Sequence, residues 1–146
     1  MKRVILAAAL SVAFLGSAVR ADAQAPPFSN GPVWDVVHIR TKDGRFDDYI
    51  KWVSTAWKQQ QEALMKAGYI IGYKVYTVVD AREGEPDILL CTEFKNMAAM
   101  DTPVAEMYDF AAKHFGAIEQ QNQQEVSRGS MRTVMGDVLI REIDLK

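Results

Sequence analysis

The chain has 146 residues, a length typical of a single domain. Hydrophobic residues make up 49% of it and charged residues 25%, which excludes a disordered tail, a collagen-like repeat and a protein with several membrane spans. The 17 basic and 19 acidic residues give a net charge of −2, so no strong positive field favours a nucleic acid as partner. The single cysteine, Cys91, cannot form an intrachain disulfide, and we expect it to be buried.

Residues 1–23 have the pattern of a cleavable secretory signal peptide. Lys2 and Arg3 precede an apolar run over 4–15, which spans about 18 Å as a helix and is too short for a hydrocarbon core of about 30 Å. The Ala-Asp-Ala sequence that ends this segment has the form that signal peptidase accepts, which predicts cleavage before Gln24. We therefore expect a periplasmic or secreted protein with no membrane segment after cleavage, the alternative being a buried N-terminal helix.

The mature chain is predicted to begin with a lead, a strand and a helix. Residues 24–32 contain three prolines and predict an extended lead. Residues 33–41 are rich in β-branched side chains and predict the first strand, which ends at a turn signal. Apolar residues recur at steps of three and four over 46–67, which predicts a helix that Gly68 terminates.

Two strands and a second helix follow. Residues 69–80 and 87–94 are predicted to pair as an antiparallel hairpin across a six-residue connection. Asn96 is a candidate cap of a short turn that ends at Met100. The pair Thr102-Pro103 then predicts the start of a helix, which we expect to continue through the glutamine-rich stretch and to end before Gly129.

Residues 133–145 predict a fourth strand, so the elements follow the order β-α-β-β-α-β. Short connections and two apolar helix stripes favour an α+β fold, a four-stranded antiparallel sheet with both helices on one face, which is the ferredoxin-like arrangement. The strands are apolar on both sides, with Val37 and Ile39 on one side of the first strand and Trp34 and Val36 on the other. This pattern predicts a homodimer that buries the uncovered sheet face; the alternative is an exposed face that tolerates apolar residues.

The segments 68–76 (GYIIGYKVY) and 93–97 (EFKNM) resemble the second strand, and the end of the third strand, of the dimeric α/β-barrel superfamily, which includes antibiotic-biosynthesis-type monooxygenases. The resemblance covers residues 33–145 and implies a single dimeric α/β-barrel-like domain over 33–146, whose two sheets face each other in the homodimer. It also implies a small ligand pocket between the sheet and the helices. Members of the superfamily include cofactor-free oxygenases, haem-degrading enzymes and proteins without known activity, so the fold does not define the function.

Aromatic residues supply candidate lining for such a pocket, and two histidines supply its polar points. The catalytic candidates are His38, in the middle of the first strand, and His114, on the second helix. The alternative for the aromatic set is ordinary core, and for the histidines a satisfied core or pocket position. The candidate ligand-pocket residues are Trp34, Trp57, Tyr73, Tyr76 and Tyr108.

No metal site or cofactor is expected, because His38, His114, Glu93 and Asp137 are too scattered in the sequence for a ligand set. The main prediction is an exported homodimer that binds a small apolar molecule or has a structural role. The alternative is a cofactor-independent monooxygenase or isomerase that acts on a small aromatic or polyketide-like substrate. Haem binding is a minor branch, in which the resemblance implies His114 as ligand, but the supporting tryptophan and asparagine of haem-degrading relatives are missing here.

Overall fold

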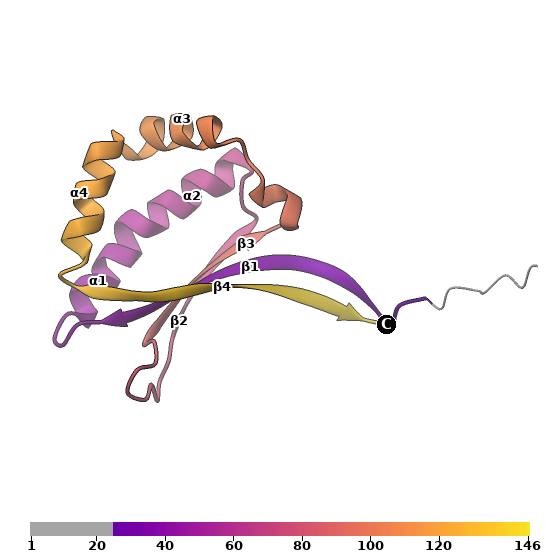
Figure 1. Ribbon diagram of the computed structural model, residues 1–146, viewed down its shortest axis with the longest axis horizontal. Coiled ribbons are helices and arrows are strands. Elements are labelled where there is room, and N and C mark those ends of the chain that lie inside the picture. Colours follow the sequence, from indigo (N-terminus) through magenta and orange to yellow (C-terminus); the bar gives the residue numbers. More distant parts are fainter. Residues whose placement is uncertain (1–24) are drawn as a thin grey trace, which may run out of the picture.

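The computed structural model describes residues 25–146, so the predicted signal peptide and its cleavage site before Gln24 lie outside the described residues. The described chain has an α+β fold with one four-stranded antiparallel sheet in the order β2-β3-β1-β4. Figure 1 shows the helices gathered on one side of this sheet. The strands are β1 (Phe28–Thr41), β2 (Gly72–Thr77), β3 (Ile88–Phe94) and β4 (Arg132–Leu145).

The strand β1 is longer than the sequence predicts. It begins at Phe28 rather than at 33, because 28–30 pair with 143–145 at the end of β4. Pro32 is compatible with this ladder because the register between β1 and β4 shifts between Asn30 and Val33. The predicted extended lead is therefore corrected for residues 28–32, which belong to the sheet.

The first helical segment covers the range that the sequence predicts, 46–67. It consists of α1 (Phe46–Trp52), a π-helical turn (Val53–Trp57) and α2 (Lys58–Ala67). Gly68 ends it in the left-handed conformation, with φ of 84°, as its position predicts. This segment carries the helix side of the core, because Tyr49, Val53 and Trp57 pack on Ile39, Ile88 and Leu90 of the sheet.

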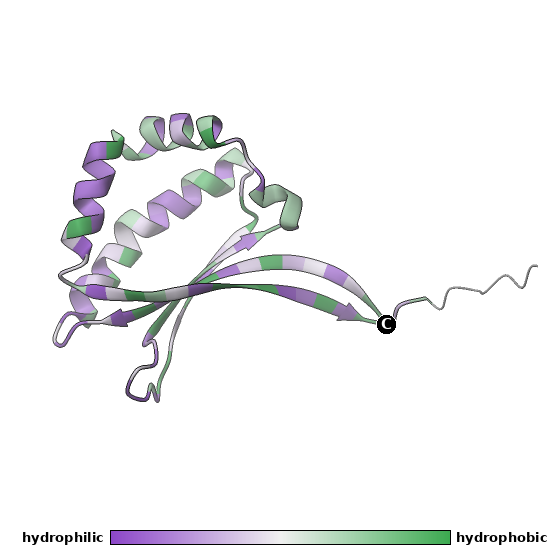
Figure 2. Ribbon diagram, viewed as in Figure 1, coloured by the Kyte–Doolittle hydropathy of each residue, from purple (hydrophilic) through white to green (hydrophobic). Residues whose placement is uncertain are grey.

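The second helix differs from its prediction. It is divided into α3 (Val104–Phe115) and α4 (Ile118–Arg128) by Gly116, whose φ of 90° does not continue a helix. Neither α3 nor α4, as the structure describes them, contains a buried residue, and Figure 2 shows that α4 is mostly hydrophilic. The expected apolar stripe is therefore not a core face: Val104 and Tyr108 are exposed. Thr102 makes no cap hydrogen bond, and the residue before the helix is Pro103.

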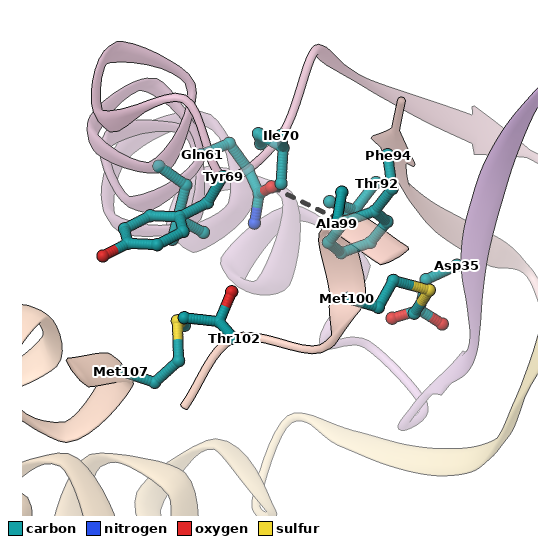
Figure 3. Close-up of a pocket in the computed structure, with 11 residues that line it drawn as sticks. Asp35, Gln61, Tyr69, Ile70, Thr92, Phe94, Ala99, Met100, Thr102 and Met107 are labelled. Atoms are coloured by element: carbon teal, nitrogen blue, oxygen red, sulfur yellow. Dashed lines mark hydrogen bonds between the residues drawn. The ribbon is translucent and has the colours of Figure 1, made fainter. Parts of the chain in front are cut away.

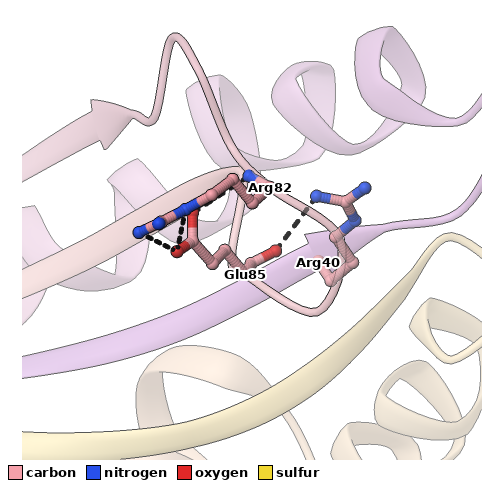
Figure 4. A network of polar contacts seen from close by, with 3 residues as sticks. All are labelled: Arg40, Arg82 and Glu85. Carbon is pink, nitrogen blue, oxygen red and sulfur yellow. Dashed lines mark hydrogen bonds and ion pairs between the residues drawn. The ribbon is translucent and has the colours of Figure 1, made fainter.

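The connections that hold the sheet together include the predicted turn and the β2–β3 loop. Asn96 caps a 3-10 turn (Met97–Met100) by accepting a hydrogen bond from the Ala99 amide, as predicted. In the β2–β3 loop, Arg82 forms an ion pair with Glu85, whose backbone carbonyl accepts a hydrogen bond of 3.0 Å from Arg40 of β1 (Figure 4). The loop is thereby fastened to the central strand.

The two faces of the sheet have different surroundings. Opposite residues of antiparallel strands share a face, so the pairs Val33–Phe94, Asp35–Thr92 and Val37–Leu90 all lie on the helix side. The other side, which we call the outer face, carries Trp34, Val36 and Cys91 as a second buried cluster. Cys91 is buried, as the sequence predicts.

Candidate functional site

A cavity of about 310 Å³ lies between the helices and the sheet, and we call it the interlayer cavity (Figure 3). Its walls come from β1, α2, the segment after α2, β3, the turn 97–100 and the start of α3. Most of the surface that faces it is apolar, as is usual for sites that bind small molecules. The lining residues are Asp35, Gln61, Leu64, Tyr69, Ile70, Thr92, Phe94, Ala99, Met100, Thr102 and Met107.

Local structure explains how three of these segments reach the cavity. The left-handed Gly68 reverses the chain after α2, so that Tyr69 and Ile70 turn back along the cavity wall. Ile70 is 3% exposed and supplies a rigid apolar part of that wall. The turn that Asn96 caps places Ala99 and Met100 opposite, at the side where β3 ends.

Asp35 is the charged group of this cavity. It lies in β1 opposite Thr92 of β3 and Leu139 of β4, on the helix side of the sheet. Its Oδ1 atom is shielded from solvent and has no hydrogen-bond partner within residues 25–146. Burial, and then the nearby Asp137 carboxylate, raise the pKa of Asp35 above its ordinary value. Asp35 lines the cavity together with Met100 and the other residues drawn in Figure 3.

Three other polar side chains of the cavity, those of Gln61, Thr92 and Tyr69, are hydrogen-bonded. Thr92 Oγ1 donates a hydrogen bond of 3.3 Å to Gln61 Oε1, and Gln61 is 7% exposed (Figure 3). The Tyr69 hydroxyl donates a hydrogen bond of 2.7 Å to the Glu106 carboxylate of α3, and this hydrogen bond raises the pKa of Tyr69. Asp35 Oδ1 is thus the solvent-shielded side-chain atom of this cavity that has no hydrogen-bond partner within residues 25–146.

A second cavity, of about 230 Å³, opens on the outer face of the sheet. Trp34 Nε1 donates a hydrogen bond of 2.6 Å to Glu142, and the Lys74 ammonium lies 4.9 Å from the centre of the Trp34 ring. Burial raises the pKa of the Cys91 thiol at its base, so this thiol is not activated as a nucleophile. The lining residues are Trp34, Val36, Lys74, Tyr76, Cys91, Ile140, Arg141 and Glu142.

The five predicted pocket residues lie at three places. Trp34 and Tyr76 line the outer-face cavity together. Trp57 and Tyr73 form an edge-to-face pair with ring centres 5.5 Å apart, beside a surface cavity of about 230 Å³. Tyr108 is 58% exposed on α3. The structure thus brings four of these five aromatics together as two pairs, leaves Tyr108 apart, and does not place the five around the interlayer cavity.

The two histidines lie apart from each other. His38 is in β1 opposite Leu89 and Gly136, and its alternation with Val37 and Ile39 places it on the outer-face side. His114 lines a cavity of about 190 Å³ between α2, α3 and α4, and its ring packs 4.4 Å from the Phe110 ring. Neither is among the residues that line the interlayer cavity.

The surroundings of His114 do not favour haem. Its cavity of about 190 Å³ is small, and three of the six residues that line it are glutamines, which does not fit a large, mainly apolar haem group. Within residues 25–146 no group of three or more histidine, cysteine, aspartate or glutamate side chains is arranged to hold a metal ion. None of the helices in the described part is long and apolar enough to span a membrane.

Sequence reasoning missed the residues that line the interlayer cavity, although a signal for one of them, Asp35, exists. It shares its side of β1 with Val33, Val37 and Ile39, so the alternation places an acidic residue on the helix-facing, apolar side. A lone carboxylate at such a position is unusual, because buried charges are costly unless they are paired.

Comparison with known proteins adds little to this geometry. No family model and no curated protein matches the chain. The solved structure of HapK from Hahella chejuensis is similar at 12% identity and a TM-score of 0.49, covering 75% of this chain and 91% of HapK. Protein SO0527 from Shewanella oneidensis is similar at 13% identity and a TM-score of 0.48, covering 80% of this chain and 98% of that protein. At such low similarity, the fold description rests on the strands and helices of the chain itself.

Proposed function

We propose that the chain is a small-ligand-binding protein whose ligand occupies the interlayer cavity. The observation that carries the proposal is the combination of an apolar cavity of about 310 Å³ with the shielded, unpartnered Oδ1 of Asp35 among the described residues. Apolar walls supply affinity, and a few convergent polar groups orient the ligand. A polar group without a partner is costly in a folded protein, and a bound ligand that supplies the missing hydrogen bond offsets that cost.

The direct test measures binding of the neutral apolar dye N-phenyl-1-naphthylamine, whose fluorescence rises when it leaves water. Ala99 lines the cavity, whereas the neighbouring Ala98 is exposed and does not line it. We expect the purified protein and its Ala98→Trp variant to enhance the fluorescence to the same degree. The Ala99→Trp variant fills the cavity and is expected to bind at least about 10-fold more weakly, which is the loss of about 1.4 kcal/mol. Equal binding by both variants would place the dye elsewhere and contradict the proposal.

An enzyme that moves a proton is the second candidate, because the raised pKa of Asp35 suits a general acid or base better than an ordinary surface carboxylate does. In this form of the isomerase alternative, Asp35 takes the role that the sequence suggested for a histidine. The matching test is exchange of substrate C–H protons with solvent deuterium, which we expect to be lost in Asp35→Asn. Retention of exchange in that variant would exclude Asp35 as the base.

The finer description of the fold is also a proposal, namely a ferredoxin-like domain that forms a dimeric α/β barrel with a second copy. The strand order β2-β3-β1-β4 and the gathering of helices on one side support it. Apolar residues on the outer face support the dimer, since Trp34 lies opposite Ile140 and Val36 lies opposite Val138. Ile140 and Val138 are 50% and 41% exposed in the single chain, which leaves an apolar surface for a partner to bury.

Export is proposed on the sequence of residues 1–23, which precede the described part. The basic start, the short apolar run and the Ala-Asp-Ala sequence support cleavage before Gln24. The intact mass of protein recovered from the periplasm or medium tests this directly. A mass that corresponds to a chain starting at Gln24 is expected, and a full-length chain confined to the cytoplasm would contradict the proposal.

A further inference from the structure

The interlayer cavity is lined by an acidic side chain and, among the described residues, by no basic one. Among the described residues that line it, Asp35 is the one aspartate or glutamate, and no lysine, arginine or histidine is present. Tyr69 is titratable, but its hydroxyl is already engaged with Glu106. A ligand in this cavity therefore meets apolar walls, a few neutral polar groups and one carboxylate.

Neighbouring strands do not neutralise this carboxylate. Asp137 and Arg141 of β4 pair with Val37 and Val33, on either side of Asp35, so they are its diagonal neighbours on that strand, and Arg141 also lines the outer-face cavity. Asp137 adds negative charge near Asp35. Arg141 forms neither an ion pair nor a side-chain hydrogen bond with Asp35 in the part of the chain that the structure describes.

The chemistry of an unpaired carboxylate in apolar surroundings discriminates between ligand classes. An anionic ligand is repelled and loses its hydration without compensation. A neutral hydroxyl donates an ordinary hydrogen bond, whereas an ammonium group donates a charge-assisted one, which is about twice as strong. The apolar walls at the same time disfavour small, fully hydrated cations that have no apolar part.

We infer that the interlayer cavity selects molecules that carry a protonated amine on an apolar body, with the Asp35 carboxylate as the counter-ion of that amine. The inference rests on the proposed ligand-binding function and specifies its ligand class. The flexible, unbranched Met100 also lines the cavity and can adapt to the body of such a ligand.

Three probes of similar size and one aromatic ring test this inference by isothermal titration calorimetry at pH 7. They are 2-phenylethylamine, 2-phenylethanol and phenylacetate, which are cationic, neutral and anionic. We expect the amine to bind at least about 10-fold more tightly than the alcohol, and phenylacetate to bind most weakly. In Asp35→Asn the preference for the amine should fall to within about 2-fold, whereas Asp43→Asn, a change in an exposed turn, should leave it unchanged.

The outcomes separate this inference from the proposed function. If the alcohol or phenylacetate binds as tightly as the amine, or if Asp35→Asn keeps the preference, the amine selectivity is wrong while ligand binding stands. If none of the three probes binds, and N-phenyl-1-naphthylamine also fails to bind, both proposals are overturned. Protonation of Asp35 gives a further check, since the affinity for the amine should fall as the pH is lowered through the pKa of Asp35.

Discussion

Asp35 contributes to the pH dependence of stability in a direction opposite to that of most carboxylates. Its pKa is raised in the folded chain by burial and by Asp137, relative to about 3.9 in an unfolded chain. The folded state therefore holds the proton more tightly, and the free energy of unfolding falls as the pH rises through the pKa of the folded state. We expect Asp35→Asn to be more stable than the wild type at pH 7 and to lose that advantage below about pH 4. Urea denaturation across this pH range measures the difference in free energy of unfolding between the two proteins. If Asp35→Asn were less stable than the wild type at pH 7, the ionised Asp35 would not destabilise the fold, which would contradict this account.

The pKa of Glu125 is shifted downward, which is the usual direction for a carboxylate in a folded protein. Burial alone raises the pKa of Glu125, but hydrogen bonds from Arg132 and Arg128 outweigh it and lower the pKa below its ordinary value. This pairing links the end of α4 to the start of β4. Stability from it is present above about pH 4.3, the unfolded value, and is lost as the pH falls through the lower pKa of the folded state.

We therefore expect Glu125→Gln to lower the free energy of unfolding at pH 7 by about 1 kcal/mol, discounted because the carboxylate is half exposed. Glu119→Gln on the same helix is the matched control, since Glu119 is exposed and makes no ion pair among the described residues. Thermal and urea denaturation at pH 7 check the pair. Equal loss in both variants would show that the arginine contacts are not the cause.

At the scale of elements, local signals in the sequence were sufficient for most of the fold. Turn residues, β-branched runs and the helical spacing over 46–67 predict the elements within a few residues of their observed ends. The errors have a common cause, which is long-range pairing or packing. Residues 28–32 join the sheet only because the distant 141–145 segment pairs with or lies beside them, and no local pattern shows this.

The same limit applies to the second helix. Its apolar spacing predicts a core face, yet α3 does not contribute buried residues in the single described chain. Gly116 divides the segment, and the Gln121 side chain donates a hydrogen bond of 2.7 Å to the Gly116 carbonyl at the break.

The pocket residues were missed for a related reason. Aromatic content indicated a pocket, but alternation along β2 places Tyr73 on the helix side and Tyr76 on the outer face, where Trp34 of β1 also lies.

Gly68 offers a test of how the left-handed residue at the end of α2 contributes to stability. Its φ of 84° lies in the left-handed region, and a Cβ added there meets no other atom within 4 Å. The cost of Gly68→Ala is therefore one of backbone strain, about 1 kcal/mol. Gly68→Asn should cost less, because asparagine tolerates this conformation. Chemical denaturation of the two variants checks this order, and an equal or larger loss for asparagine would contradict it.

At the scale of the whole molecule, the outer face of the sheet is the surface through which we expect two copies of the chain to form a homodimer. The outer side of the sheet carries a buried cluster around Trp34 whose rim, at Val138 and Ile140 of the edge strand β4, is exposed. Burial of this apolar surface in a homodimer is favourable by about 25 cal/mol per Å². An exposed edge strand of this length is otherwise a site of unspecific association.

We expect light scattering to give the molar mass of a dimer for the wild type. Ile140→Glu places a charge on the outer face and is expected to give a monomer, whereas Val104→Glu, on the exposed start of α3, should leave the dimer intact. A monomeric wild type would contradict the dimer without affecting the interlayer cavity, which is lined by residues of one chain. A dimer that survives Ile140→Glu would place the interface elsewhere.

Occupation of the interlayer cavity is tested most directly by nuclear Overhauser effects between the ring protons of 2-phenylethylamine and assigned methyl groups of the protein. Binding in this cavity predicts contacts to the methyl groups of Ile70, Met100 and Met107, which line it from three different segments. Contacts to Val36 and Ile140 instead would place the ligand on the outer face of the sheet and contradict the assignment of the site.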